Sequence, residues 1–191
     1  MRRTKVIAFA GLDGSGKSTQ IETIKKLLEI QGYKVKIQQH FATSIGEKCK
    51  DIIEISKEPH IRAFAFALDE YAQKLNNIED ADYDVILCDR SHYCAYAYSG
   101  AQGLDFNWID TLYKYSQEYD LCIYLDISLD TSFKHKAFDS ISPNLSVQQF
   151  KKVRDNYLRL VDSRKLVKVN AEQEFSIVTE EIYALVMGVL G

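Results

Sequence analysis

The chain has no apolar run long enough to cross a membrane, which takes about 20 consecutive apolar residues. Its basic start, Met1-Arg2-Arg3, is typical of a signal peptide, but the apolar run after it is too short and ends in a glycine-rich segment. We therefore expect a cytoplasmic protein with no membrane partner.

The chain also has little net charge and few prolines. The formal net charge is −3, so the basic footprint of a nucleic-acid-binding protein is missing and no nucleic-acid partner is expected. The 191 residues include only two prolines and are 46% hydrophobic, and no linker-like stretch or internal repeat interrupts them. We predict one folded domain over residues 1–191.

The four cysteines lack both a C-x-x-C pair and the spacing of a metal site; they are Cys49, Cys88, Cys94 and Cys122. Two of them, Cys88 and Cys122, lie inside apolar runs that are typical of strands. We expect buried, reduced thiols, as in a cytosolic protein.

Short apolar or β-branched runs alternate along the chain with longer segments of helical spacing. The predicted strands are 6–10, 34–38, 84–88, 121–126 and 166–169. The predicted helices include 20–31, 61–75, 146–161 and 172–190. This alternation favours an α/β protein with a parallel sheet covered by helices on both faces.

Residues 11–19 read G-L-D-G-S-G-K-S-T, between the first predicted strand and the first predicted helix. They match the phosphate-binding pattern G-x-x-x-x-G-K-[ST] in full, in which backbone N–H groups cradle a polyphosphate. In this motif Lys17 reaches the β- and γ-phosphates, Ser18 binds Mg²⁺, and the helix N-terminus faces the same anion. The predicted nucleotide-binding residues are Gly11, Asp13, Gly14, Ser15, Gly16, Lys17, Ser18 and Thr19.

A second motif is the apolar run 85–88, which ends in Asp89-Arg90. An aspartate after such a strand holds Mg²⁺ in many phosphate-loop proteins, and elsewhere caps a helix. The planar guanidinium of Arg90 can bind a phosphate through two hydrogen bonds, or form a structural salt bridge. Beside a complete phosphate loop, we predict Ser18 and Asp89 as metal ligands.

The loop alone does not separate a kinase from a GTPase or a motor ATPase. The N-K-x-D signature of a GTPase is absent, and the chain is small for a motor ATPase. We therefore favour a small-molecule kinase that uses ATP and Mg²⁺.

Three further segments resemble the thymidylate kinase family of nucleoside-monophosphate kinases. Residues 89–100 are similar to its D-R-Y-x-x-S-x-x-A-Y-x-G stretch, 153–158 to the start of its V-R-x-x-Y-x-x-L stretch, and 120–126 to its D-L-x-x-x-L-D strand. The resemblance runs from about residue 4 to the end of the chain. It implies a phosphate-loop NTPase fold, a three-layer sandwich with a five-stranded parallel sheet in the order 2-3-1-4-5, and a homodimer.

The resemblance also implies roles for individual residues. Lys17 and Ser18 would hold ATP and Mg²⁺, assisted by Asp89. Asp13 would contact the acceptor sugar or a metal-bound water, and Arg90 the acceptor phosphate. The acceptor itself would lie against Tyr98 at its sugar and Phe66 at its base.

Core packing is the alternative role for Phe66. Its helix repeats apolar residues in a stripe that we predict to face the core, made of Ile61, Phe64, Leu68, Ala72 and Leu75. Phe66 lies off this stripe, with Arg62 and Glu70 one turn to either side. We predict that these three residues form a wall of the acceptor site.

Two departures from the family concern the acceptor. The segment 40–44 after the second strand has no arginine, where the family carries one. Glu70 occupies the position of an arginine that reads thymine O4, which exchanges a donor for an acceptor. This favours a cytosine- or guanine-like base, or a non-nucleotide acceptor.

A third departure concerns catalysis. The family places transition-state arginines in the phosphate loop or in a lid, but Gly14 occupies the loop position. The lid-like segment 133–146 has only Lys134, His135 and Lys136 as basic residues. We predict that Lys136, with Lys134, supplies the lid charge, although lysine replaces arginine imperfectly.

The leading hypothesis is phosphotransfer from ATP to a nucleoside monophosphate such as dTMP, which needs cationic groups and no general base. A nucleoside or other hydroxyl kinase is the alternative, with Asp13, Glu70 or Asp89 as candidate base. The absence of lid arginines leaves a third hypothesis, a nucleotide-binding protein with reduced catalysis.

Overall fold

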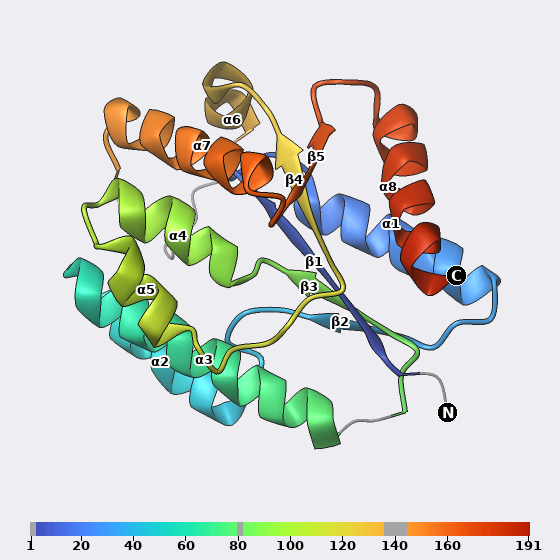
Figure 1. Cartoon of the computed structure of the whole chain (residues 1–191), viewed down its shortest axis with the longest axis horizontal. Helices are drawn as coiled ribbons and strands as arrows, with labels where there is room; N and C mark the ends of the chain where they lie inside the picture. The colour runs from blue at the N-terminus through green and yellow to red at the C-terminus, as the bar shows by residue number, and fades with distance from the viewer. Residues whose placement is uncertain (1–2, 80–81, 136–144) are drawn as a thin grey trace.

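A five-stranded sheet forms the centre of the molecule, with all strands parallel in the order β2-β3-β1-β4-β5 (Figure 1). This computed structural model describes residues 3–79, 82–135 and 145–191. The strands are β1 (Lys5–Gly11), β2 (Val35–Gln38), β3 (Val85–Asp89), β4 (Leu121–Asp126) and β5 (Val167–Asn170). They confirm the predicted fold class and strand order.

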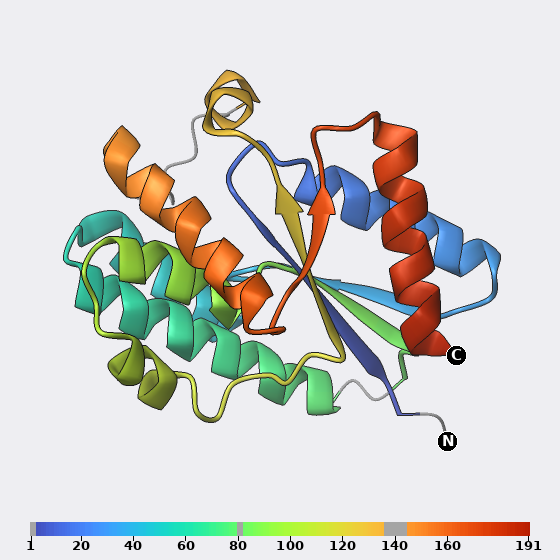
Figure 2. The ribbon, with the colours of Figure 1, turned by 45° about the horizontal axis from the view of Figure 1, so that its top comes forward.

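Helices cover both faces of the sheet. They are α1 (Lys17–Ile30), α2 (Ser44–Ile55), α3 (Pro59–Glu79), α4 (His92–Ala101), α5 (Phe106–Leu112), α6 (Leu129–His135), α7 (Val147–Asp162) and α8 (Phe175–Leu190). Figure 2 shows α1 and α8 on one side of the sheet and α3, α4 and α7 on the other. The arrangement is the predicted three-layer sandwich.

Strand β1 separates the two hydrophobic cores. Side chains alternate across a strand, so Ala8 and Ala10 pack toward α4 and α7, whereas Ile7 and Phe9 pack toward α1 and α8. Every residue from Val6 to Leu12 is buried. The central strand is therefore apolar on both faces, as a parallel sheet requires.

Four helices were not predicted from the sequence: α2, α4, α5 and α6. Helix α4 reads H-Y-C-A-Y-A-Y-S-G-A, in which small and aromatic residues give no clear helical periodicity, and α5 and α6 have only seven residues each. The predicted lid begins inside α6, and residues 136–144 of that prediction lie outside the described residues.

The prediction for the core-facing stripe of α3 is wrong. Ile61, Phe64, Leu68 and Leu75 are 45%, 55%, 49% and 44% exposed, and only Ala72 of the stripe is buried. The helix instead buries a polar face with Arg62, Asp69, Glu70 and Gln73, together with small alanines. The helical periodicity identified the apolar face of α3 correctly. It could not show whether that face packs against the core or lies on the surface.

The parallel strands bring their carboxyl ends to one edge of the sheet. Phe9 pairs with Asp89 on β3, and Gly11 pairs with Leu125 on β4. The phosphate loop after β1 therefore lies beside the ends of β3 and β4, where ligands bind in open α/β sheets.

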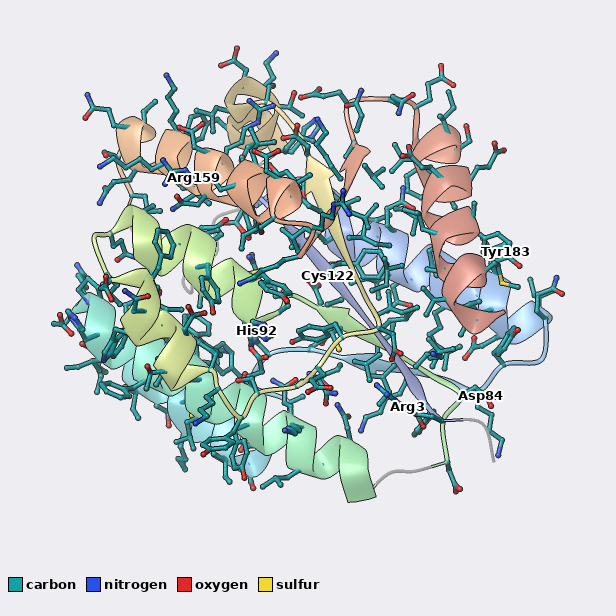
Figure 3. The ribbon with its side chains drawn as sticks, in the orientation of Figure 1. Arg3, Asp84, His92, Cys122, Arg159 and Tyr183 are labelled. Carbon is teal, nitrogen blue, oxygen red and sulfur yellow. The ribbon has the colours of Figure 1, made fainter. Side chains whose placement is uncertain are left out.

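All four cysteines are free and buried, as expected. Cys122, on β4, is labelled in Figure 3. Within the described part of the chain, no helix is both long enough and apolar enough to span a bilayer.

Candidate active site

The phosphate loop turns from β1 into α1, with Gly16 as the N-cap of the helix at φ 83°. The buried ammonium of Lys17 donates to loop acceptors, at 2.9 Å from the carbonyl oxygen of Leu12, 3.3 Å from that of Gly11 and 3.4 Å from Ser15 Oγ. Burial, and then the nearby charge of Arg90, lower the pKa of Lys17 from 10.5 to about 8. The loop thus holds a desolvated cation on its own carbonyl groups.

The two predicted metal ligands lie together. Ser18 Oγ donates a hydrogen bond of 2.6 Å to Asp89 Oδ2, which joins the start of α1 to the end of β3. A hydroxyl and a carboxylate are oxygen ligands of the kind Mg²⁺ takes, and Mg²⁺ commonly completes its shell with waters and substrate phosphates. The described residues contain no cluster of three His, Cys, Asp or Glu side chains that could hold an ion without such help.

Asp13 and Arg90 form a hydrogen-bonded ion pair between the phosphate loop and the residue after β3. Arg90 has a positive φ of 87°, and its backbone N–H donates to the carbonyl of Phe9 at 3.0 Å. Its guanidinium lies 5.8 Å from the centroid of the Tyr98 ring. Arg90 therefore forms the structural ion pair and also lies at the predicted phosphate site.

Two cavities open at this edge of the sheet. The first adjoins the phosphate loop and is lined by Asp13, Gly14, Gly16, Lys17, Ser18, Thr19, Gln39, His40, Asp89, Arg90 and His135. The second lies between α3 and α4 and is lined by His40, Phe41, Pro59, Arg62, Phe66, Glu70, Arg90, Ser91, Cys94, Ala95, Tyr98, Ser99, Gln102 and Tyr113. We call them the phosphate cavity and the acceptor cavity. All five residues predicted to bind the acceptor line the second one: Arg62, Phe66, Glu70, Arg90 and Tyr98.

Phe66 is half-buried at the wall of the acceptor cavity. Its ring centroid lies 5.5 Å from that of Phe41 and 5.4 Å from that of His40. Phe66 thus packs against neighbouring aromatic rings and also lines the acceptor cavity. It combines the packing role and the cavity-wall role that the sequence left as alternatives.

Glu70 is only 3% exposed and already has partners. Its Oε1 atom lies 3.1 Å from His92 Nδ1 and accepts a hydrogen bond of 2.9 Å from the Tyr119 hydroxyl. Figure 3 labels His92 at the start of α4. Burial and the adjacent Glu70 raise the pKa of Tyr119 well above its ordinary value, so this hydroxyl stays a donor.

The Arg62 side chain, on α3, binds carbonyl groups at the end of α2. Its Nη1 atom donates to the carbonyls of Ile53, at 2.6 Å, and Ser56, at 3.3 Å, at the end of α2. Burial lowers the pKa of its guanidinium. It lines the acceptor cavity while satisfying carbonyl groups that the helix end leaves open.

Tyr98 closes another side of the acceptor cavity. Its hydroxyl is buried and has no hydrogen-bond partner of standard geometry among the described residues. Burial raises the pKa of this hydroxyl. A buried hydroxyl without a partner at a cavity wall is a group that a ligand could satisfy.

Helix α6 packs against the phosphate loop. Ser132 Oγ donates 2.7 Å to the carbonyl of Asp13, and a Cβ atom on Gly14 would lie 2.9 Å from His135 Cβ. Gly14 also has a φ of 81°, which side-chain-bearing residues rarely adopt. The exposed His135 lines the phosphate cavity, and Lys136 lies outside the described residues.

The sequence-based prediction gave no site role to His40, His92 or Tyr119. The position of His40 after β2 places it near the ligand-binding edge of the sheet, but that position alone assigns it no chemistry. His92 and Tyr119 reach Glu70 only through the packing of α3 against α4 and the segment before β4, which no local pattern encodes.

The parallel sheet, the phosphate loop and the adjoining cavities define a phosphate-loop nucleotide-binding protein of the kinase class. The thymidylate kinase family model matches residues 9–182. The probable thymidylate kinase of Sulfolobus acidocaldarius is 35% identical over 192 residues, covering 97% of each chain. Those of Methanosphaera stadtmanae and Pyrococcus horikoshii are each 31% identical, covering 92% and 94% of this chain and 94% of their own.

The chain therefore belongs to the thymidylate kinase family, which confirms the resemblance found in the sequence. The protein is a nucleoside-monophosphate kinase, an enzyme that transfers a phosphoryl group between nucleotides.

Proposed function

We propose that the protein transfers the γ-phosphoryl group of ATP, bound with Mg²⁺, to a nucleoside monophosphate held between α3 and α4. The observation that carries this proposal is that the acceptor cavity and the phosphate cavity share a cationic wall at Arg90. The phosphate of a nucleoside monophosphate in the acceptor cavity would meet the donor phosphates of the phosphate cavity there.

The phosphate loop would hold the donor through its backbone N–H groups and Lys17. In the free protein the Lys17 ammonium donates to loop carbonyls, and phosphate oxygens would replace these weaker acceptors. Ser18 and Asp89 would supply two oxygens for the ion. Bound Mg²⁺ would neutralise charge on the donor phosphates.

The acceptor would be oriented by its own phosphate and by its base. Asp13 orients the Arg90 guanidinium, so Arg90 would bind the acceptor phosphate with less loss of side-chain entropy than an unpaired arginine. Phe66 offers a ring face to the base, and Tyr98 a hydroxyl to the sugar. A phosphate nucleophile is already ionised, so no general base is required.

The alternative of a hydroxyl kinase needs a carboxylate able to accept a proton from the acceptor. Asp13 is paired with Arg90, Asp89 with Ser18, and Glu70 with His92. These partners favour phosphate transfer between nucleotides over proton abstraction from a sugar. Lys136 stays a predicted source of positive charge in the lid.

We also propose a homodimer and a cytoplasmic location. The exposed members of the α3 stripe form a row on the outer face of the helix together with Tyr71, which is 42% exposed; these members are Ile61, Phe64, Leu68 and Leu75. A second copy of the chain could bury such a row. Four buried thiols without disulfides suit a reducing compartment.

The deciding experiment measures ADP release with ATP and Mg²⁺ across dTMP, dUMP, dCMP, dGMP and the matching nucleosides. We expect activity with at least one monophosphate and none with the nucleosides. Lys17→Ala should abolish it, whereas Lys26→Ala, exposed on the same helix, should not. Flat ADP release across the panel with retained ATP binding would instead support the hypothesis of reduced catalysis.

A further inference from the structure

Only two side chains of the described residues line both cavities: Arg90 and His40. They come from different strand ends, since Arg90 follows β3 and His40 follows β2. An acceptor whose base lies in one cavity and whose phosphate reaches the other must pass between them. His40 therefore lies where the second wall of an acceptor-phosphate site would be.

The orientation of the His40 ring is fixed by Asp69. His40 Nδ1 lies 2.8 Å from Asp69 Oδ2, and Asp69 has no exposed surface. A carboxylate accepts hydrogen bonds and cannot donate them, so Nδ1 carries the proton of this bond. This leaves Nε2 as the ring nitrogen available to a ligand.

Asp69 is itself held firmly. It accepts hydrogen bonds from the backbone N–H of Phe41, at 3.1 Å to each oxygen, and from Gln73 Nε2 at 2.7 Å. These hydrogen bonds hold the Asp69 carboxylate, on α3, against the backbone that follows β2. His40 is the one ion-pair partner of Asp69 within the described parts of the chain.

Two features of the backbone near His40 support its position. Phe41 has a positive φ of 64° although it is not glycine, and its N–H bonds to Asp69 stabilise that conformation. Gly46 on α2 leaves the space, because a Cβ atom there would lie 2.5 Å from Asp69 Oδ1 and 2.6 Å from Phe41 Cα. A strained residue and a closely packed glycine thus support one histidine at the junction of the cavities.

We propose that His40, positioned by Asp69, binds the phosphate monoester of the acceptor opposite Arg90. When the ring carries both protons, Nε2–H donates a charge-assisted hydrogen bond to a phosphate oxygen, while Nδ1–H stays on Asp69. His40 then supplies the cationic contact for which the segment 40–44 offers no arginine. This inference rests on the proposed function, because it assigns a ligand to the same acceptor site.

The test compares acceptors with and without a phosphate. In His40→Gln we expect the KM or Kd for dTMP and dCMP to rise about 10–100-fold, the usual effect of losing a hydrogen bond to a charged group. Binding of thymidine and deoxycytidine should stay unchanged, because neither of them places a phosphate at His40. His40→Arg should recover part of the loss.

His60→Gln is the matched control. His60 forms the same kind of pair, with Nδ1 3.1 Å from Glu58 Oε1, but lines neither cavity. It should leave every constant unchanged. An unchanged KM for the monophosphates in His40→Gln, or an equal loss for nucleosides and nucleotides, would overturn the proposal.

A measurement on the wild-type protein keeps the test decisive if the variants fold poorly. The ¹⁵N resonance of His40 Nε2 should shift on titration with dTMP or dCMP and not with the nucleosides. Absence of a phosphate-dependent shift, under conditions where the monophosphate binds, refutes the role of His40 and leaves the proposed function standing. Failure of the proposed function would appear separately, as a lack of ADP release with every monophosphate.

Discussion

Glu70 Oε1 and His92 Nδ1 lie 3.1 Å apart, which joins α3 to the start of α4 beside the acceptor cavity that Glu70 lines. Among the described residues, both hydrogen-bond partners of Glu70 contact this one oxygen, the second being the Tyr119 hydroxyl. A base bound in the acceptor cavity as proposed would meet a carboxylate held by two neighbouring side chains.

This pair predicts a base preference. A carboxylate accepts from the exocyclic amino group of cytosine but not from the O4 carbonyl of thymine. In Glu70→Gln, whose amide can also donate, the ratio of kcat/KM for dTMP to that for dCMP should rise about tenfold. Steady-state kinetics with both nucleotides measure the ratio, with the exposed Glu22→Gln as control. An unchanged ratio in Glu70→Gln, and likewise in Glu70→Arg, would remove Glu70 from base recognition.

The lowered pKa of Lys17 predicts that ATP binding takes up a proton. At pH values above about 8 the free protein has largely lost the proton on Lys17, whereas bound phosphates favour the charged form. Affinity for ATP should therefore fall as pH rises above about 8. Calorimetry at pH 8.5 in two buffers of different ionisation enthalpy should show net uptake, and equal apparent enthalpies would contradict it.

Lys17 should also make the stability of the free protein depend on pH: stability should rise over the pH range in which ATP affinity falls. Its pKa is about 8 in the folded protein and 10.5 in the unfolded chain, so unfolding between these values binds a proton. The free energy of unfolding of the free protein should then gain a contribution that rises from pH 8 to pH 10.5. In Lys17→Met that contribution should vanish in urea titrations, whereas Lys26→Met should retain it.

Gly14 should tolerate no side chain. Gly14→Ala adds a Cβ at a φ of 81°, where it meets His135 Cβ and the Ser132 carbonyl. We expect a loss of about 1–3 kcal/mol in the free energy of unfolding, with weaker ATP binding. Gly188→Ala in α8, where a Cβ has no neighbour within 4 Å, should be neutral or stabilising. Equal effects of the two substitutions would show that α6 does not restrict the loop.

The apolar stripe of α3 predicts self-association. Leu68→Lys, at a position 49% exposed in the single chain, should convert a dimer to a monomer in light scattering after gel filtration. Ile30→Lys, 78% exposed at the end of α1, should leave the oligomeric state unchanged. A wild-type monomer at tens of micromolar would contradict the proposed dimer.

The sequence was most informative where function depends on local geometry. The phosphate loop binds through backbone groups of consecutive residues, so its pattern is visible in residues 11–19, and each buried strand is a short apolar run. The acceptor cavity is different because its lining residues come mainly from α3, α4 and the segments after β2 and β3, which lie far apart in the sequence. Its important contacts, Asp69 with His40 and Glu70 with His92, join segments 29 and 22 residues apart.

Helix α3 explains why burial was harder to predict than secondary structure. Its polar face is buried because every charge there finds a partner from another element, while its apolar face lies outside. Hydrophobic periodicity identifies two faces of a helix but not their surroundings. Only the tertiary arrangement decides that carboxylates on this helix enter the interior.

The hydrogen bond from Ser132 to the Asp13 carbonyl has a thermodynamic consequence. Any ligand that stabilises one arrangement of the phosphate loop must stabilise the matching arrangement of α6 by the same coupling free energy, and the reverse holds equally. A change in α6 that depends on this hydroxyl would therefore alter nucleotide affinity, and bound nucleotide would alter α6 by the same amount.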